Sequence, residues 1–178
     1  IFFDDATFNV NKKRVIDICK GMANENINIS WGCSCRVDKV DEEMLEHMKK
    51  SGCRIICYGP ESASEETLKK TNKQIDVSQA FNAIQLTKRA GIIAHANFMV
   101  GFPWETKEDM QKTIEFAQKL NPDTIQISLV FPHPGSEMYD QAIENNWFED
   151  GIVGNWDRFE MALGPVLKSK VSKEDLQS

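Results

Sequence analysis

Apolar and polar residues alternate in two different ways along the chain. Short, nearly continuous apolar runs are typical of strands that are covered on both faces. Between these runs, apolar residues recur every three or four positions, as in a helix with one buried face. The predicted strands are residues 1–4, 27–33, 54–58, 92–100 and 124–131, and helices are predicted over 11–24, after Asp41, after Ser62, from Ser78 to Gly91, after Thr106 and from Ser136 to about Asn146.

Residues with capping side chains mark the starts of several of these helices. Caps are predicted at Asp41 and Ser78, and capping boxes at Ser62 with Glu65 and at Thr106 with Asp109. The helical period also predicts which side chains face the core. They are Val15, Ile18, Cys19 and Met22, then Met44, Leu45 and Met48, then Phe81, Ile84 and Thr87, and finally Met110, Thr113, Ile114, Ala117 and Leu120.

The order of these elements predicts the fold class. A strand followed by a helix, five times over, implies parallel strands that are joined by right-handed crossovers. The sequence therefore predicts an α/β fold, with a partial (β/α) TIM-like barrel as the first choice and a doubly wound sheet as the second. Residues 147–165 are expected to be irregular, with Trp147 and Trp156 packing over an open edge.

Composition narrows the classes of function. The 178 residues carry a net charge of −6 and no cluster of Lys and Arg, which disfavours direct binding of nucleic acid. No apolar run approaches the ~18 residues of a membrane-spanning helix. The five cysteines have no spacing of a secreted scaffold, so reduced thiols in a cytoplasmic protein are expected. The pairs Cys33–Cys35 and Cys53–Cys57 are interpreted as small core residues rather than zinc ligands.

Polar, Gly and Pro residues gather where each predicted strand ends, whereas the opposite connections look like plain turns. In parallel barrels the active site lies at the carboxyl ends of the strands. The segments to consider are therefore 4–5, 33–36, 59–62, 101–106 and 132–136. Their asymmetry predicts one site on one face of the molecule.

Several of these segments form an ordered set of family motifs. They are 3–8 with Trp31 and Arg36, then 49–53 with 58–62, then 98–106 (FMVGFPWET), and finally 132–137 (PHPGSE). The set resembles the strand-end motifs of radical S-adenosylmethionine (radical SAM) enzymes. Within that superfamily it is most similar to the subgroup with an N-terminal cobalamin-binding domain, which includes anaerobic magnesium-protoporphyrin ester cyclase-like proteins and cobalamin-dependent methyltransferases.

This resemblance implies two cofactors, a [4Fe-4S] cluster held by a CxxxCxxC loop and S-adenosylmethionine (SAM), with cobalamin in an upstream domain. The sequence contains no CxxxCxxC, and both ends look cut. We therefore expect residues 1–178 to be one core fragment, with strands two to six of the barrel and a tail over 147–178. The cluster cysteines are expected upstream of Ile1, so the fragment alone is expected to be inactive. The resemblance also implies a small-molecule substrate and an electron donor such as a ferredoxin or flavodoxin.

The resemblance also implies roles for single residues. Asp5 would lie near the methionine amino group, and Glu61 and Ser62 near the ribose or sulfonium. The residues expected to bind the cofactor are Asp5, Arg36, Glu61, Ser62, Asn97, Met99, Gly101 and Phe131. Purely structural roles stay open for three of them, since Asp5 could bind the next helix, Arg36 could pair with an acidic neighbour and Glu61 lies beside the predicted cap Ser62.

Two other classes of function remain open. A barrel lyase or isomerase could use Asp5 and Glu61 as acid–base carboxylates without iron. A non-catalytic binding module is the third reading. Because a strand at the edge of a sheet exposes unpaired backbone groups, the isolated fragment is also expected to dimerise edge to edge.

Overall fold

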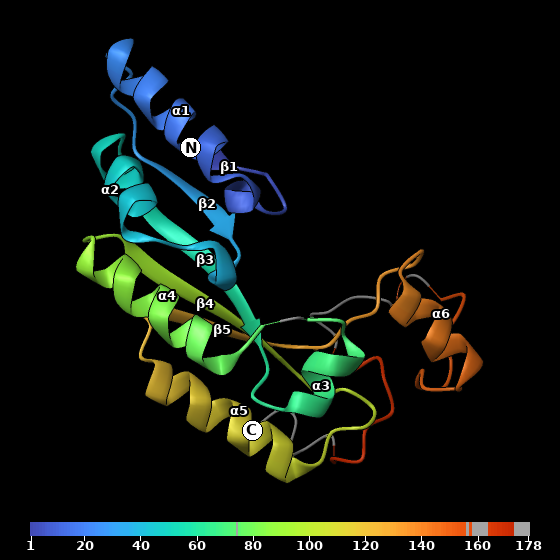
Figure 1. The fold of residues 1–178 in the computed structure, drawn as a ribbon. Coiled ribbons are helices and arrows are strands. Elements are labelled where there is room, and N and C mark those ends of the chain that lie inside the picture. Colours follow the sequence, from blue (N-terminus) through green and yellow to red (C-terminus); the bar gives the residue numbers. More distant parts are fainter. Residues whose placement is uncertain (74, 156, 158–163, 173–178) are drawn as a thin grey trace.

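The protein is described here from a computed structural model, which covers residues 1–73, 75–155, 157 and 164–172. Five parallel strands form one sheet in the order β1-β2-β3-β4-β5 (Figure 1). The strands are β1 (Phe2–Phe3), β2 (Trp31–Cys35), β3 (Cys53–Glu61), β4 (Ile93–Val100) and β5 (Thr124–Leu129). The helices are α1 (Lys12–Asn24), α2 (Glu42–Lys50), α3 (Glu65–Lys70), α4 (Val77–Arg89), α5 (Lys107–Leu120) and α6 (Glu137–Glu144), with 3-10 turns η1 (Phe8–Val10) and η2 (Val37–Lys39).

The strand order distinguishes between the two predicted architectures. A doubly wound sheet reverses its strand order at a switch point, whereas a barrel adds each strand beside the previous one. Here the order is sequential, and α1, α2, α4 and α5 lie on the same side of the sheet (Figure 1). The α/β fold with parallel strands in a partial-barrel arrangement is therefore confirmed.

Local capping explains where the helices begin. The Asp41 carboxylate accepts a hydrogen bond from the Met44 amide, and Thr106 forms a capping box with Asp109, as predicted. Two predicted caps are wrong. α3 is capped by Ser64 instead of Ser62, because pairing with β4 extends β3 as far as Glu61.

The second wrong cap is at α4. Asp76 caps this helix and forms a capping box with Gln79, so the helix begins before Ser78. Phe81 is 48% exposed, although it was predicted to face inward, because the buried face of α4 is formed by the other residues at helical spacing. Those residues are Ala80, Ala83, Ile84, Leu86 and Thr87.

Three other expectations about the core were partly wrong. β2 begins at Trp31 rather than at Ile27, since its pairing with β3 starts at Trp31 and Cys53. Ile114 lies at the margin of the buried face of α5 and is 36% exposed. On α1, Ile16 is buried beside the predicted residues, while Ile18 packs against the core only partly buried.

The main hydrophobic core lies between the sheet and its helices. Trp31 is buried, and its indole N–H donates to the Ser51 carbonyl oxygen at 2.9 Å. The Tyr58 hydroxyl lies 2.7 Å from the Thr87 hydroxyl, which joins β3 to α4 inside the core. Polar groups in this layer are thus paired, as burial requires.

A second, smaller hydrophobic cluster lies beyond the carboxyl end of β4 and β5. Its buried members include Phe102, Val130 and Phe148, and Trp147 packs at its edge against Trp104. Phe148 and Leu167 form an isolated antiparallel bridge, so part of the C-terminal tail closes this cluster. Trp156, which was expected to pack over an open edge, lies outside the described residues. No helix among the described residues is long and apolar enough to cross a membrane.

Candidate functional site

A polar cavity of about 250 Å³ opens at the carboxyl ends of β2, β3 and β4. Parallel strands end at one edge of the sheet, which is why residues far apart in the sequence meet here. Three of the predicted cofactor residues line it, namely Arg36, Glu61 and Asn97. The other lining residues are Ala6, Thr7, Ser34, Cys35, Val37, Cys57, Tyr58, Gly59, Lys73 and Ile75.

Glu61 reaches the cavity through an irregularity in β3. The register with β4 shifts between Tyr58 and Glu61, and Glu61 has a left-handed backbone conformation with φ of 65°. A side chain on Gly59 would overlap the Glu61 carboxylate, so glycine at this position leaves room for the carboxylate to lie across the strand. Outliers of this kind concentrate at functional sites.

Lys73 is the cation that the sequence analysis missed. Its ammonium donates to Glu61 Oε1 at 2.9 Å, and both side chains line the cavity. Lys73 lies in the connection after α3, and its amide donates to the Leu68 carbonyl oxygen. No local pattern distinguishes Lys73 from the nearby Lys69 and Lys70, so the sequence alone did not single it out.

Arg36 lies on the other side of the cavity, directly after β2. Its guanidinium makes two hydrogen bonds to the Asp38 carboxylate, at 2.8 and 3.0 Å, and this contact lowers the pKa of Asp38. The Arg36 backbone is held by Asn9, a buried residue whose side chain bonds both the Arg36 amide and its carbonyl oxygen. The acidic neighbour that was proposed for Arg36 is therefore present, while Arg36 still lines the cavity.

Asn97 approaches the cavity from β4. Its side-chain carbonyl oxygen lies 3.0 Å from His95 Nε2, and its amide nitrogen donates to the Tyr58 carbonyl oxygen at 3.4 Å. His95 in turn lies 2.8 Å from the Thr124 hydroxyl. These contacts hold Asn97 on the face of the sheet opposite to the buried residues Ala96 and Phe98.

Five predicted site residues lie outside the lining of this cavity, and two of them, Asp5 and Ser62, have other partners. The Asp5 carboxylate accepts from Arg14 of α1 at 2.9 Å, so it contacts the next helix, although Ala6 and Thr7 of the same loop reach the cavity. Ser62 is 1% exposed, and its hydroxyl lies 3.2 Å from that of Thr113. Ser62 thus joins the end of β3 to α5.

Met99, Gly101 and Phe131 lie toward the second hydrophobic cluster instead. Met99 and Phe131 pack against it partly buried. Gly101 ends β4 with φ of 86°, a conformation that favours glycine. Its amide donates to the buried carboxylate of Glu105 at 2.9 Å, a residue to which the sequence analysis gave no role.

The described residues do not form a metal site. Among them, no group of three or more His, Cys, Asp and Glu side chains could hold a metal ion. The Cys33 and Cys35 sulfurs are 3.7 Å apart and buried, and the neighbouring thiols of Cys35 and Cys53 together with burial raise the pKa of Cys33. Neutral, buried thiols are poor metal ligands, and these residues do not fit an iron–sulfur cluster.

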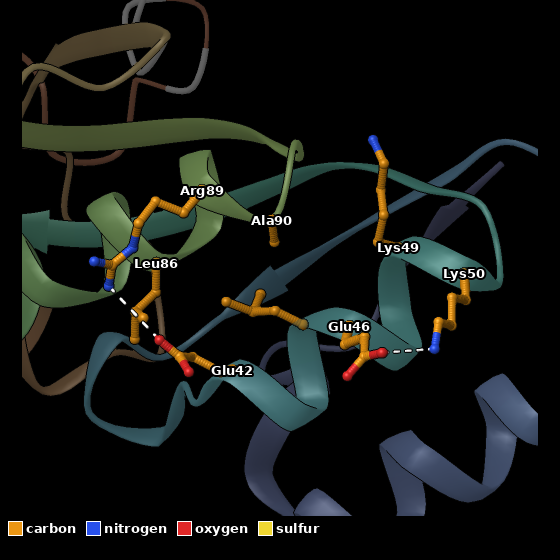
Figure 2. Close-up of a pocket in the computed structure, with 8 residues that line it drawn as sticks. Glu42, Glu46, Lys49, Lys50, Leu86, Arg89 and Ala90 are labelled. Atoms are coloured by element: carbon orange, nitrogen blue, oxygen red, sulfur yellow. Dashed lines mark hydrogen bonds and ion pairs between the residues drawn. The ribbon is translucent and has the colours of Figure 1, made fainter.

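A larger groove of about 460 Å³ lies between α2 and α4 (Figure 2). Leu45, Leu86 and Ala90 contribute its apolar lining. Its charged residues pair with one another, Glu42 with Arg89 and Glu46 with Lys50, while Lys49 donates to the Gly91 carbonyl oxygen. This groove shares no residue with the strand-end cavity. Because active sites of parallel barrels lie at the carboxyl ends of the strands, the strand-end cavity is the candidate site.

Comparison with known proteins identifies the family of the chain. The model of the radical SAM superfamily matches residues 2–117, which is more than half of the chain. The chain therefore belongs to the radical SAM superfamily, a family of enzymes that use a [4Fe-4S] cluster and SAM. The enzyme class that the ordered motifs predicted is confirmed.

Two curated relatives show the subgroup to which the chain is similar. An uncharacterized methyltransferase of Pyrococcus horikoshii is 38% identical over 170 residues, which are 96% of this chain and 36% of that protein. The anaerobic magnesium-protoporphyrin IX monomethyl ester cyclase of Rubrivivax gelatinosus is 31% identical over 134 residues, or 74% of this chain and 24% of that protein. The chain thus spans about a third or less of the length of these relatives.

Solved structures share the fold. The radical SAM methyltransferase TsrM of Kitasatospora setae, with cobalamin and a [4Fe-4S] cluster bound, matches 81% of this chain and 28% of its own with a TM-score of 0.71 and 19% identity. Coproporphyrinogen III oxidase of Escherichia coli matches 94% of this chain and 35% of its own with a TM-score of 0.64 and 18% identity. The likeness supports the partial barrel.

Proposed function

We propose that this chain forms the wall that binds SAM in a radical SAM enzyme. The main observation in support is that one cavity at the strand ends of a chain of this family is lined by Arg36, Glu61, Lys73 and Asn97. SAM has a zwitterionic amino acid, a ribose and an adenine. Such a ligand needs charged groups, hydrogen-bond acceptors and an apolar shelf.

The charged groups of the cavity are proposed to contact different parts of SAM. Lys73 and Arg36 would bind the carboxylate of the methionine part, since ammonium and guanidinium groups form the strong hydrogen bonds to carboxylates. Glu61 Oε1 already accepts from Lys73, and the carboxylate would also accept a ribose hydroxyl. Asn97 would contact the ribose from the neighbouring strand.

The adenine side of the site is proposed at the second hydrophobic cluster, where Met99, Gly101 and Phe131 lie. Asp5 and Ser62 are left out of the proposed contacts, because Asp5 pairs with Arg14 and the Ser62 hydroxyl bonds to Thr113. A lyase that uses Asp5 and Glu61 together is disfavoured for the same reason.

The whole protein is proposed to carry out methyl transfer on a small molecule in the cytoplasm. When bound, the cluster supplies the electron that cleaves SAM to a 5′-deoxyadenosyl radical. Methyl transfer is supported by the similarity to the methyltransferase of Pyrococcus horikoshii and by the fold shared with TsrM. The similarity to the Rubrivivax cyclase supports cyclisation as the second candidate reaction. An upstream cobalamin domain, cluster cysteines upstream of Ile1 and a ferredoxin or flavodoxin as electron donor belong to this proposal.

The test uses the full-length protein, purified anaerobically and reconstituted with iron and sulfide. SAM that donates its methyl group leaves S-adenosylhomocysteine, whereas reductive cleavage yields 5′-deoxyadenosine, so both products are measured by chromatography. Release of either product, with a visible iron–sulfur absorbance, supports the proposal. A protein that carries the cluster but neither binds nor consumes SAM contradicts it.

A further inference from the structure

Glu105 is the acidic side chain that the described part of the chain buries most completely, with 1% exposed. It lies in the turn between β4 and α5. Glu105 Oε2 accepts from the amides of Gly101 at 2.9 Å and Phe102 at 3.1 Å. Glu105 Oε1 accepts from the Thr67 hydroxyl at 3.1 Å. Because a buried carboxylate is costly unless it is hydrogen-bonded, these three bonds account for its place in the interior.

The two oxygens bind two different walls of the candidate site. Oε2 holds the turn that ends β4, the strand that carries Asn97. Oε1 holds α3, the six-residue helix that leads to Lys73. Asn97 and Lys73 both line the cavity. The side chain of Glu105 therefore joins the two elements that carry opposite sides of the cavity, namely β4 with Asn97 and α3 with Lys73.

α3 is too short to keep its position without contacts to other elements. A helix of six residues is marginal on its own, so its place depends on contacts with the rest of the protein. The turn after β4 supplies such contacts, since the Trp104 indole N–H donates to the Thr67 hydroxyl at 3.1 Å and Lys70 lies 4.7 Å over the Trp104 ring. The end of α3 in turn holds the Lys73 amide through the Leu68 carbonyl oxygen.

We propose that Glu105 is a positioning residue that sets the separation of Lys73 from Asn97 and thereby the affinity for SAM. Glu105 acts through Thr67 and through the backbone of the β4 turn, without touching SAM. This inference rests on the proposed function, because it assumes that SAM lies between the two walls. It predicts that loss of the Glu105–Thr67 bond raises the KM for SAM while kcat changes little.

The experiment compares four variants of the full-length, reconstituted protein. Thr67→Val keeps the side-chain shape but removes the hydroxyl, and Thr67→Ser restores it. Glu105→Gln removes the charge, and Glu108→Gln is the matched control on the exposed first turn of α5. Melting temperature, iron content, the Kd for SAM and the KM and kcat for SAM are measured for each.

We expect Thr67→Val and Glu105→Gln to raise the Kd and KM for SAM about tenfold, the factor for one hydrogen bond to a charged group. Thr67→Ser and Glu108→Gln should stay within about twofold. A fifth protein, the double variant Thr67→Val with Glu105→Gln, should lose less affinity than the product of the two single effects, because both changes act on the same bond. A purely structural role would lower the melting temperature without moving the Kd of the folded protein.

Unchanged Kd and KM in a folded, iron-loaded Thr67→Val protein would overturn the inference. If Glu105→Gln fails to fold, the Thr67 pair still decides the matter, since Ser keeps the hydroxyl that bonds to Glu105 and to the Trp104 indole whereas Val lacks it. Failure of the proposed function looks different, because the wild-type protein itself would then neither bind nor cleave SAM.

Discussion

The connections at the two ends of the sheet differ in which residues adopt left-handed backbone conformations. At the amino ends of the strands these residues are Asn26, Gly52, Gly91 and Asn121, the residue types that tolerate positive φ. At the carboxyl ends Gly101 and Glu61 adopt it, and every non-glycine residue with positive φ in the described part of the chain other than Glu61 is an asparagine. One end is built for low strain, while the other places a charged side chain despite the strain.

The strongest test of the low-strain end is Gly52→Ala. Gly52 has φ of 98°, and an added methyl group would overlap the Ile29 carbonyl oxygen, which belongs to the backbone and cannot rotate away. We expect the free energy of unfolding to fall by about 3 kcal/mol, the upper range for one strained residue. Urea unfolding followed by circular dichroism measures it.

Gly135→Ala is the control for this change, since Gly135 has φ of 84° but no atom within 4 Å of the added methyl group. It should cost only the backbone term of about 1 kcal/mol. Equal losses in the two variants would mean that close packing against Ile29 does not matter.

At the functional end, the largest expected effect comes from Lys73→Met. The variant keeps a long side chain but removes the cation next to Glu61, so the affinity for SAM should fall about tenfold or more. Equilibrium dialysis with labelled SAM measures the change. Lys69→Met, on the exposed side of α3, is the matched control and should bind as the wild type does. Equal affinity for SAM in both variants would show that Lys73 does not bind SAM.

Comparing Glu61→Asn with Glu61→Gln separates the backbone strain at this position from the role of its carboxylate in binding SAM. Asparagine tolerates positive φ, so this variant should unfold with a free energy about 1 kcal/mol higher than Glu61→Gln, which keeps the strain. Both variants remove the carboxylate and should bind SAM more weakly than the wild type. A Gln variant as stable as the Asn variant would show that Glu61 stores no strain.

The smallest effect concerns pH. Burial raises the pKa of Glu105, and the hydrogen bonds from Phe102, Thr67 and Gly101 only partly oppose it. Between the unfolded and native pKa values of Glu105, the native state binds more protons than the unfolded state. The contribution of Glu105 to the free energy of unfolding is therefore fully present below its unfolded pKa of 4.5, and it is lost as pH rises through its native pKa.

Urea midpoints between about pH 4 and pH 7 should therefore decline more steeply for the wild type than for Glu105→Gln. Parallel curves for the two proteins would show that Glu105 titrates as it does in the unfolded chain. Glu108→Gln, which changes an exposed carboxylate, should follow the wild-type curve.

Patterns within one element predicted the fold well. The strand–helix alternation led to the parallel sheet, and the caps at Asp41 and Thr106 were correct because each depends on a residue three positions away. The errors at Ser62 and Ser78 were shifts of two residues. At Ser62, the true start depended on how far the pairing between β3 and β4 continued, and sequence period alone contains no such information.

The sequence by itself indicated the family, the parallel α/β sheet and the edge of the sheet where polar residues gather, whereas the strand order came from the structure. Only the tertiary structure showed that Lys73 meets Glu61, that Ser62 turns to Thr113 and that Glu105 reaches Thr67. These contacts join residues 12, 51 and 38 positions apart. Side-chain direction at such positions is set by packing between elements, and local propensity does not encode that packing.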